Sequence, residues 1–153
     1  MPTVRKSVDA MELKEFLSER DRFARGIGAR LEEVRPDYAR SVLTVGAKHL
    51  NAGDVCQGGV IYTLADLTFA ALVNASGFLT PLVSGTIYYH RSAHLGDTLT
   101  AEGRVMSDHH KLPCAIVEVR TQDGTHVATF TGEGYVTRAP LPVTTDDSST
   151  AIA

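Results

Sequence analysis

The sequence has few cysteines, no clustered charge and no long apolar run. Its two cysteines, Cys56 and Cys114, are too few for a disulfide framework and lie in no CxxC or Cys/His spacing typical of a zinc site. The formal net charge of -3 is spread without blocks of like sign, so it indicates no nucleic-acid or membrane surface. No run approaches the roughly 20 apolar residues of a membrane span, and the N-terminus lacks an apolar signal core. We therefore expect a cytoplasmic protein that binds neither nucleic acid nor membrane.

The chain is long enough for one hydrophobic core and needs no second domain. It has 153 residues, of which 43% are hydrophobic. We expect a single domain over residues 1–138. The remaining residues, 139–153, are rich in Pro, Thr, Ser and Asp without periodicity, which is typical of a disordered tail.

Two segments have apolar residues at helical spacing. The first follows Asp9, which lies three residues before Glu12 as in a capping box, and extends to Ala24. The second runs from about Gly58 to Ala75 and has no proline, no glycine after its first two residues and few charges. It should therefore be a central, nearly enclosed helix.

Most of the remaining chain has strand patterns. The segments on either side of Arg35-Pro36-Asp37, a turn signal, form a first hairpin. Four more strands follow, separated by short turn-like segments, at residues 82–91, 98–107, 114–122 and 126–138. Asp123-Gly124 is the strongest hairpin signal in the sequence. Successive hairpins predict an antiparallel meander.

This order of elements predicts an α+β fold. A curved antiparallel sheet would wrap around one long central helix, with a short N-terminal helix in addition. Such a sheet leaves unpaired edges, and pairing with a second copy is the simplest way to cover them. The pattern thus favours a homodimer.

The start of the central helix is a candidate site. A helix N-terminus presents unpaired N–H groups and a partial positive charge, and Gly58 and Gly59 would let a ligand oxygen approach that backbone. The alternative is that the two glycines only permit a tight entry into the helix.

Asp66, in the middle of the same helix, is a second candidate. No Lys or Arg lies three or four residues away to pair with it, so burial of this acid would perturb its pKa. The alternative is a solvent-facing stripe that also contains Thr63 and Asn74. Gly58 and Asp66 are eight residues apart, or roughly 12 Å along a helix, and cannot contact one carbonyl together. If both act on one carbonyl, they must come from different copies of the chain.

At these residues the sequence resembles the hotdog-fold acyl-CoA thioesterases, in the branch of phenylacetyl-CoA and 4-hydroxybenzoyl-CoA thioesterases with an HGG-x6-D motif. The resemblance covers roughly residues 27–138. It implies that the Gly58 N–H binds the thioester oxygen and that Asp66 is the general base or nucleophile. An asparagine lies six positions before the motif histidine in that family, and here Asn51 lies six positions before Gln57.

The resemblance also implies roles for residues after the helix. Ser84 matches a Ser or Thr that orients the attacking water. Arg91 begins a segment similar to R-P-x-x-x-G-D-x-L and would reach a CoA phosphate, with Ser92 where proline is common. The family further implies a homodimer with a composite site, and pairing of dimers into a tetramer.

Gln57 departs from the family pattern, because it replaces the histidine. Glutamine keeps a donor and an acceptor but cannot titrate near neutral pH. A positioning role for Gln57 survives, whereas a role as an acid is lost.

The resemblance predicts hydrolysis of an aryl or medium-chain acyl-CoA, with no cofactor and no metal. Two alternatives stay open. One is a non-catalytic acyl-CoA-binding or interaction module, and the other is a hydratase or dehydratase of acyl thioesters. The second needs a catalytic histidine that Gln57 removes. The acyl group itself is not readable from the sequence.

Overall fold

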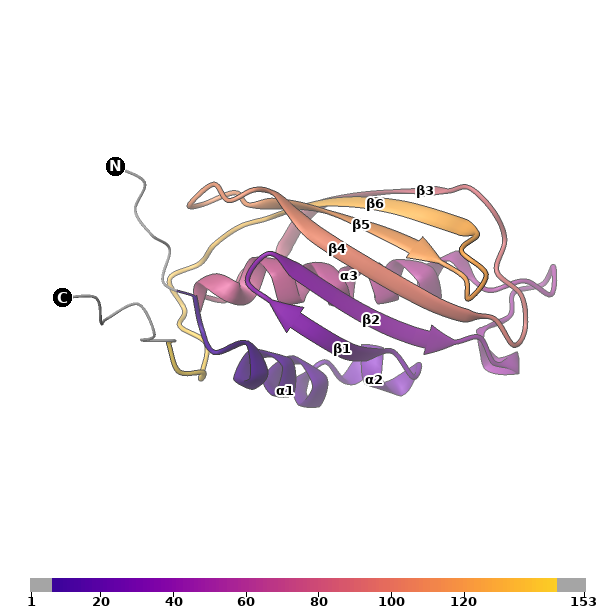
Figure 1. Ribbon diagram of the computed structural model, residues 1–153, viewed down its shortest axis with the longest axis horizontal. Coiled ribbons are helices and arrows are strands. Elements are labelled where there is room, and N and C mark those ends of the chain that lie inside the picture. Colours follow the sequence, from indigo (N-terminus) through magenta and orange to yellow (C-terminus); the bar gives the residue numbers. More distant parts are fainter. Residues whose placement is uncertain (1–6, 146–153) are drawn as a thin grey trace.

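The computed structural model describes residues 7–145, which form one curved sheet around a central helix (Figure 1). In chain order the elements are α1 (Ala10–Arg20), α2 (Arg22–Gly26), β1 (Arg30–Arg35), β2 (Tyr38–Thr44), a 3-10 turn (Ala47–His49), α3 (Gly58–Val73), a second 3-10 turn (Asn74–Ser76), β3 (Leu82–Tyr89), β4 (Thr98–Ser107), β5 (Cys114–Arg120) and β6 (His126–Gly134). The predicted α+β arrangement is thus confirmed.

The sheet is antiparallel throughout, in the order β1-β2-β4-β5-β6-β3. The meander is confirmed for β4, β5 and β6, but it was wrong for β3. That strand pairs with β6, with Ile87 opposite Phe130, and leaves β4 to pair with β2. The connection at residues 90–97 is longer than the two to five residues of a usual hairpin loop, so it can carry the chain across the sheet.

The sheet closes tightly on α3 because two strands carry glycines that face it. A Cβ at Gly103 would lie 2.9 Å from Cδ1 of Leu72, and one at Gly132 would lie 2.9 Å from Cε2 of Phe69. Phe69 packs edge-on against Phe130 of β6, with ring centroids 5.9 Å apart. The sheet-facing side of α3 therefore forms the centre of the core.

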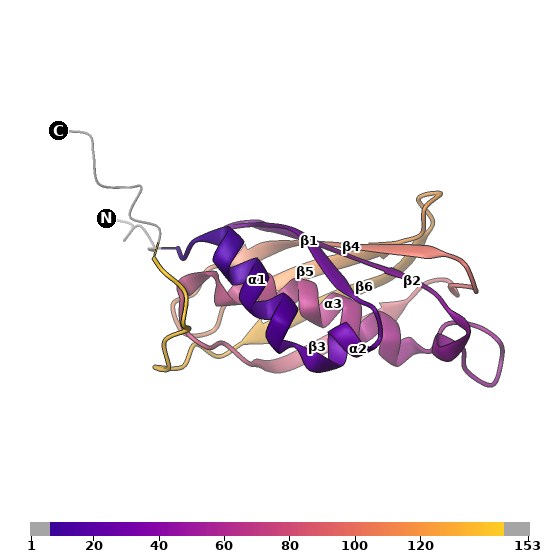
Figure 2. The same ribbon diagram turned by 90° about the horizontal axis from the view of Figure 1, so that it is seen from below.

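The N-terminal segment forms two helices where the sequence predicted one. The N–H of Asp21 donates to the Leu17 carbonyl at 2.9 Å and ends α1, and its side chain accepts the Ala24 N–H at 3.0 Å and begins α2. Figure 2 shows α1 and α2 lying beside α3, next to β1. Asp9 caps α1 by accepting the Glu12 N–H at 2.9 Å, as predicted.

Part of the predicted tail is ordered. Phe78 forms an isolated β-bridge with Pro140, and the Leu141 N–H donates to the Gly77 carbonyl at 2.7 Å. Leu141 is apolar and buried, which explains why this stretch packs on the domain. Residues 146–153 lie outside the described part of the chain.

Residues Gly58–Ser76 are long and apolar enough to cross a membrane by composition alone, but 56% of that window is buried inside the fold. The core helix of a soluble protein has the same properties, so the observation is weak evidence for a membrane span. The cytoplasmic location stays a prediction.

Candidate active site

Side-chain hydrogen bonds hold both the N–H and the carbonyl group of Gly58, the first residue of α3. Gln57 is the N-cap residue, and its Oε1 accepts the Gly58 N–H at 3.0 Å. The hydroxyl of Tyr89, at the end of β3, donates to the Gly58 carbonyl oxygen at 2.7 Å. A Cβ at Gly58 would lie only 3.0 Å from Cζ and Oη of Tyr89. Glycine is therefore needed here for a close approach of a side chain, beyond any role in entering the helix.

A hollow of about 330 Å³ opens beside this helix start. It is lined by Cys56, Gly58, Ile61, Tyr89, His90, Arg91 and Ser92. Two predicted site residues, Gly58 and Arg91, thus share one hollow, and Arg91 is exposed. The partial positive charge of the helix terminus and the guanidinium both favour a ligand with negative or carbonyl oxygens.

His49 fixes the loop that leads to the helix. Its buried imidazole accepts the Gly46 N–H at Nδ1, at 2.9 Å, and donates from Nε2 to the Ile27 carbonyl at 2.7 Å. Because an N–H can only donate and a carbonyl can only accept, the ring is the neutral Nε2–H tautomer. The His49 carbonyl in turn accepts the Gln57 N–H at 2.7 Å, so His49 anchors the helix cap.

Asn51 shapes the same loop. Its side-chain Oδ1 accepts the N–H groups of Gly53 and Val55, at 2.8 and 3.4 Å, and its own N–H donates to the Val55 carbonyl at 2.8 Å. In the described part of the chain, the side-chain nitrogen of Asn51 donates no hydrogen bond. That nitrogen is the group that a ligand can meet.

Asp66 lies two turns further along α3, and its carboxyl is partly buried. It has no hydrogen bond or ion pair with any residue that the structure describes. Burial raises the pKa of the Asp66 carboxyl above its ordinary value, and the negative charge of Asp21 raises it further. A raised pKa of this origin is typical of functional carboxylates, and it argues against a fully solvated surface acid.

Ser84 lies on the exposed edge strand β3, beside the register shift between Leu82 and Ser84. Neither Asp66 nor Ser84 lines the hollow at Gly58. A single chain therefore brings Gln57, Gly58 and Arg91 together and leaves Asp66 apart from them.

Comparison with known proteins identifies the family. The model of the thioesterase superfamily matches residues 53–128. The acyl-coenzyme A thioesterase PaaI of Escherichia coli is 31% identical over 117 residues, which are 76% of this chain and 84% of PaaI. The chain belongs to the thioesterase superfamily. A second relative is the Archaeoglobus fulgidus protein named "Putative esterase". It is 31% identical to this thioesterase over 142 residues, which are 93% of this chain and 92% of the relative.

Solved structures confirm the hotdog fold and the resemblance to PaaI-like enzymes. The structure of E. coli PaaI, a protein of the phenylacetic acid degradation operon, superposes with a TM-score of 0.83 at 28% identity, covering 86% of this thioesterase and 96% of PaaI. A protein of Streptococcus mutans, solved with acetyl-CoA bound, gives a TM-score of 0.70 at 27% identity, covering 74% and 91% of the two chains.

The sequence did not single out three residues of this thioesterase that act at the candidate site. Tyr89 contacts Gly58, His49 anchors Gln57, and the charge of Asp21 acts on Asp66. The adjacent pair Tyr88-Tyr89 is a signal that could have found Tyr89, because alternation in a strand turns one of the two rings toward the helix. Nothing in the spacing of His49 or Asp21 pointed to Gln57 or Asp66.

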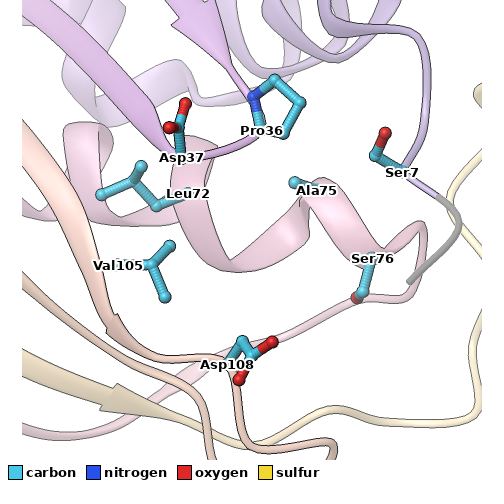
Figure 3. A pocket seen from close by; sticks show the side chains of 8 residues that line it. All are labelled: Ser7, Pro36, Asp37, Leu72, Ala75, Ser76, Val105 and Asp108. Atoms are coloured by element: carbon cyan, nitrogen blue, oxygen red, sulfur yellow. The ribbon is translucent and has the colours of Figure 1, made fainter. Parts of the chain in front are cut away.

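Other features of this thioesterase lie away from the site. A cavity of about 260 Å³ at the opposite end of α3 is lined by Leu72, Ser76, Asp37 and Asp108, among others (Figure 3). Over residues 7–145, no group of three or more His, Cys, Asp and Glu side chains is arranged to hold a metal ion.

Proposed function

We propose that this thioesterase hydrolyses an acyl-CoA thioester to a carboxylic acid and CoA. Water adds its oxygen to the carbonyl carbon, the carbon–sulfur bond breaks, and the thiolate leaves and takes up a proton. The similarity to PaaI, an acyl-CoA thioesterase, supports this activity, and the acetyl-CoA bound to the Streptococcus mutans relative supports the CoA carrier. The reaction needs no metal and no cofactor.

One observation carries the proposal at the level of residues. The Gly58 N–H already binds a carbonyl oxygen, that of the Gln57 side chain. The Gln57 Oε1 is an amide carbonyl oxygen, and it accepts the Gly58 N–H at 3.0 Å. A thioester oxygen that replaced it would meet the same donor and the same helix terminus. Negative charge developing on that oxygen would be stabilised there, and such a donor contributes about 10²–10³ in rate.

We propose that Asp66 completes the site from a second copy of the chain. Its separation from Gly58 along α3, roughly 12 Å, prevents both groups from reaching one carbonyl within one chain. The residues of α3 that are not buried against the sheet include Gly59, Thr63, Asp66 and Ala70, which share one side of the helix. Two α3 helices packed along this side would bring Asp66 of one chain toward Gly58 of the other.

The edge strand β3 supports the same dimer. Among the strands of residues 7–145 it pairs only with β6, and it exposes Val83, Tyr88 and Tyr89, with 56%, 67% and 49% of their surfaces accessible. An unpaired, apolar edge is a ready template for a second strand. We propose that β3 pairs with β3 of the other copy, and that two dimers form a tetramer.

The remaining predicted residues take supporting roles. Asp66 would either deprotonate the attacking water or attack the carbonyl carbon directly to form an anhydride with release of the thiolate. Ser84 would orient the water, and the amide nitrogen of Asn51 would donate to the substrate. Gly59 leaves room for the thioester, and Arg91 would bind a CoA phosphate.

The test is release of free thiol from a panel of aryl- and fatty-acyl-CoAs by the wild type, by Asp66→Asn and by the control Asp54→Asn. Asp54 is exposed in the loop before α3. We expect turnover by the wild type and the control, and a loss of about 10²–10⁴ in kcat for Asp66→Asn. Binding of every acyl-CoA without turnover by the wild type would support a non-catalytic acyl-CoA-binding module instead. Equal activity of Asp66→Asn would exclude the role of Asp66.

A further inference from the structure

Tyr62 lies on α3 midway between the two main residues of the proposed site. It follows Gly58 by four residues and precedes Asp66 by four, so each pair is about one helical turn apart. Its ring meets that of Phe130, on β6, edge-on, with ring centroids 5.3 Å apart. Packing against the core therefore fixes the direction of the Tyr62 side chain.

The Tyr62 hydroxyl points at β3, where Gly85 makes room for it. A Cβ at Gly85 would collide with the hydroxyl oxygen. Tyr62 is half-buried, yet its hydroxyl makes no hydrogen bond with any residue between 7 and 145. Phenylalanine would pack in the same place and would not need a hydrogen-bond partner. Core packing thus accounts for the ring and leaves the hydroxyl to be explained.

The same hydroxyl lies near the proposed base. Side chains four residues apart on a helix have Cβ atoms about 5–6 Å from each other. Burial raises the pKa of the Tyr62 hydroxyl, and the charge of Asp66 raises it further, which requires the two groups to be close. The phenol therefore keeps its proton at neutral pH and can donate it in a hydrogen bond. No hydrogen bond joins the two groups directly, and one water can bridge such a pair of oxygens.

We propose that Tyr62 is a further catalytic residue, whose hydroxyl and the carboxylate of Asp66 in the same chain hold the attacking water between them. The inference rests on the proposed function, because it concerns the nucleophile of the same reaction. The Tyr62 O–H donates to the water oxygen, and one O–H of the water donates to Asp66. The second O–H of the water is left for Ser84, which precedes Gly85 on β3.

The arrangement gives each group one step in the hydrolysis. Asp66 takes a proton from the water while the water oxygen bonds to the carbonyl carbon. The Tyr62 O–H stabilises the negative charge that develops on the water oxygen in that step. The carbon–sulfur bond then breaks, and the leaving thiolate takes up the proton held by Asp66. Asp66 thus acts as a base through the water, and the phenol ends the cycle unchanged.

Tyr62 also lies at the centre of the proposed dimer. If Asp66 of each chain faces Gly58 of the other, the two α3 helices cross halfway between these positions, at Tyr62. A water held by Tyr62 and Asp66 then lies inside the interface. The second chain covers it and brings the thioester carbonyl toward it.

Tyr62→Phe removes the hydroxyl and keeps the ring on Phe130, so folding is not at risk. We expect kcat to fall by about 10- to 150-fold with KM nearly unchanged, which corresponds to the loss of one hydrogen bond to a charged group. Tyr135→Phe is the matched control, because Tyr135 is exposed and follows β6 at the strand end near Leu82. An unchanged kcat for Tyr62→Phe would overturn the inference.

Gly85→Ala tests the placement of the hydroxyl. The added Cβ must displace the Tyr62 oxygen, so kcat should fall in the otherwise wild-type chain. In the Tyr62→Phe chain that oxygen is absent, and the same change should cost little more. Two losses that simply multiply would contradict the inference, because the two variants would then act independently.

A measurement without turnover separates this inference from the proposed function. Carbon NMR of the Asp66 carboxyl gives its pKa in the wild type and in Tyr62→Phe. The charge of Asp21, which also raises that pKa, is the same in both chains. The bridging water favours the ionised carboxylate, so the pKa of Asp66 should rise when Tyr62 no longer holds the water.

The two measurements together decide between the outcomes. A raised pKa of Asp66 in Tyr62→Phe, with no hydrolysis of any acyl-CoA by the wild type, would support the water site while the proposed function failed. An unchanged pKa would overturn the inference even if the wild type is an active thioesterase.

Discussion

The Tyr89 hydroxyl donates to the Gly58 carbonyl oxygen at 2.7 Å and thereby ties the end of the edge strand β3 to the first residue of α3. The two residues are 31 positions apart in the chain. Burial, followed by Tyr62 and Cys56, raises the pKa of the Tyr89 hydroxyl, so it stays protonated and able to donate over the working pH range. The orientation of the Gly58 peptide thus depends on the edge strand.

Tyr89→Phe tests this dependence. It removes one hydrogen bond and keeps the ring, so we expect kcat/KM to fall by about 2- to 10-fold, as the net value of a typical hydrogen bond predicts. Tyr88→Phe is the matched control, because the neighbouring ring is exposed and has no hydrogen bond to Gly58. Steady-state kinetics on one acyl-CoA measure both. A similar loss in both variants would mean that the hydroxyl of Tyr89 does not position the helix start.

Asp21→Asn should move the acid limb of the pH profile. The Asp66 carboxyl must be ionised to act as base or nucleophile, and the charge of Asp21 raises its pKa. Asparagine removes that charge but keeps an oxygen that can accept the Ala24 N–H and cap α2. The pKa of Asp66 should then fall, and activity should persist to lower pH.

The pH dependence of kcat/KM measures this shift. Asp9→Asn is the control, because Asp9 caps α1 in the same way and is not among the charges that act on Asp66. If both variants leave the acid limb where it was, Asp21 does not tune Asp66.

Asp66→Asn should stabilise the fold at neutral pH while it removes activity. A folded-state pKa raised above the ordinary carboxyl value of 3.8 means that the folded chain binds the proton more tightly than the unfolded chain. The free energy of unfolding therefore falls as the pH rises from 3.8 through the raised pKa of Asp66. Above that pKa the ionised carboxylate destabilises the fold. Asparagine carries no charge at any pH.

Thermal unfolding at pH 7 and at pH 3 measures this effect. We expect a higher Tm for Asp66→Asn at pH 7 and a smaller difference at pH 3, where Asp66 is protonated in both states. The exposed control Asp54→Asn should show no such pattern. A lower Tm for Asp66→Asn at pH 7 would show that ionised Asp66 is favourably placed.

Much of this site follows from local sequence, and the rest depends on contacts between distant residues. The strand at 98–107 and the start of α3 at Gly58 agree with the prediction, because alternation, turn residues and glycines act locally. The pairing of β3 with β6 is set by the whole sheet, and the sequence could not predict it. Likewise Asp21 is 45 positions from Asp66 by their numbers, so only the fold brings that charge to the carboxyl.

His49→Ala should destabilise the loop before α3. It leaves the Gly46 N–H and the Ile27 carbonyl without their partner in a partly buried place, at a cost of up to about 1–3 kcal/mol for each group. It also loosens the anchor of Gln57, so kcat should fall with stability. Urea unfolding and kinetics measure the two effects, and the exposed His94→Ala is the control. Unchanged stability would show that water replaces the imidazole without loss.

The composite site can be tested by mixing two inactive chains. Gly58→Pro removes the N–H donor, and proline suits the first position of a helix. Gln57 already has the extended backbone, with φ -58° and ψ 132°, that precedes proline. The proline ring at position 58 must displace the hydroxyl end of Tyr89, because a Cβ at Gly58 would lie only 3.0 Å from it. Asp66→Asn removes the carboxylate from the other half of the site.

Each variant alone should be inactive. Unfolding and refolding an equal mixture gives heterodimers in about half of the dimers, and each heterodimer has one site with an intact Gly58 and an intact Asp66. Recovery of about a quarter of the wild-type activity is therefore expected, because half of the dimers then carry one intact site of two. If both groups acted within one chain, every chain in the mixture would lack one of them, and no activity would return.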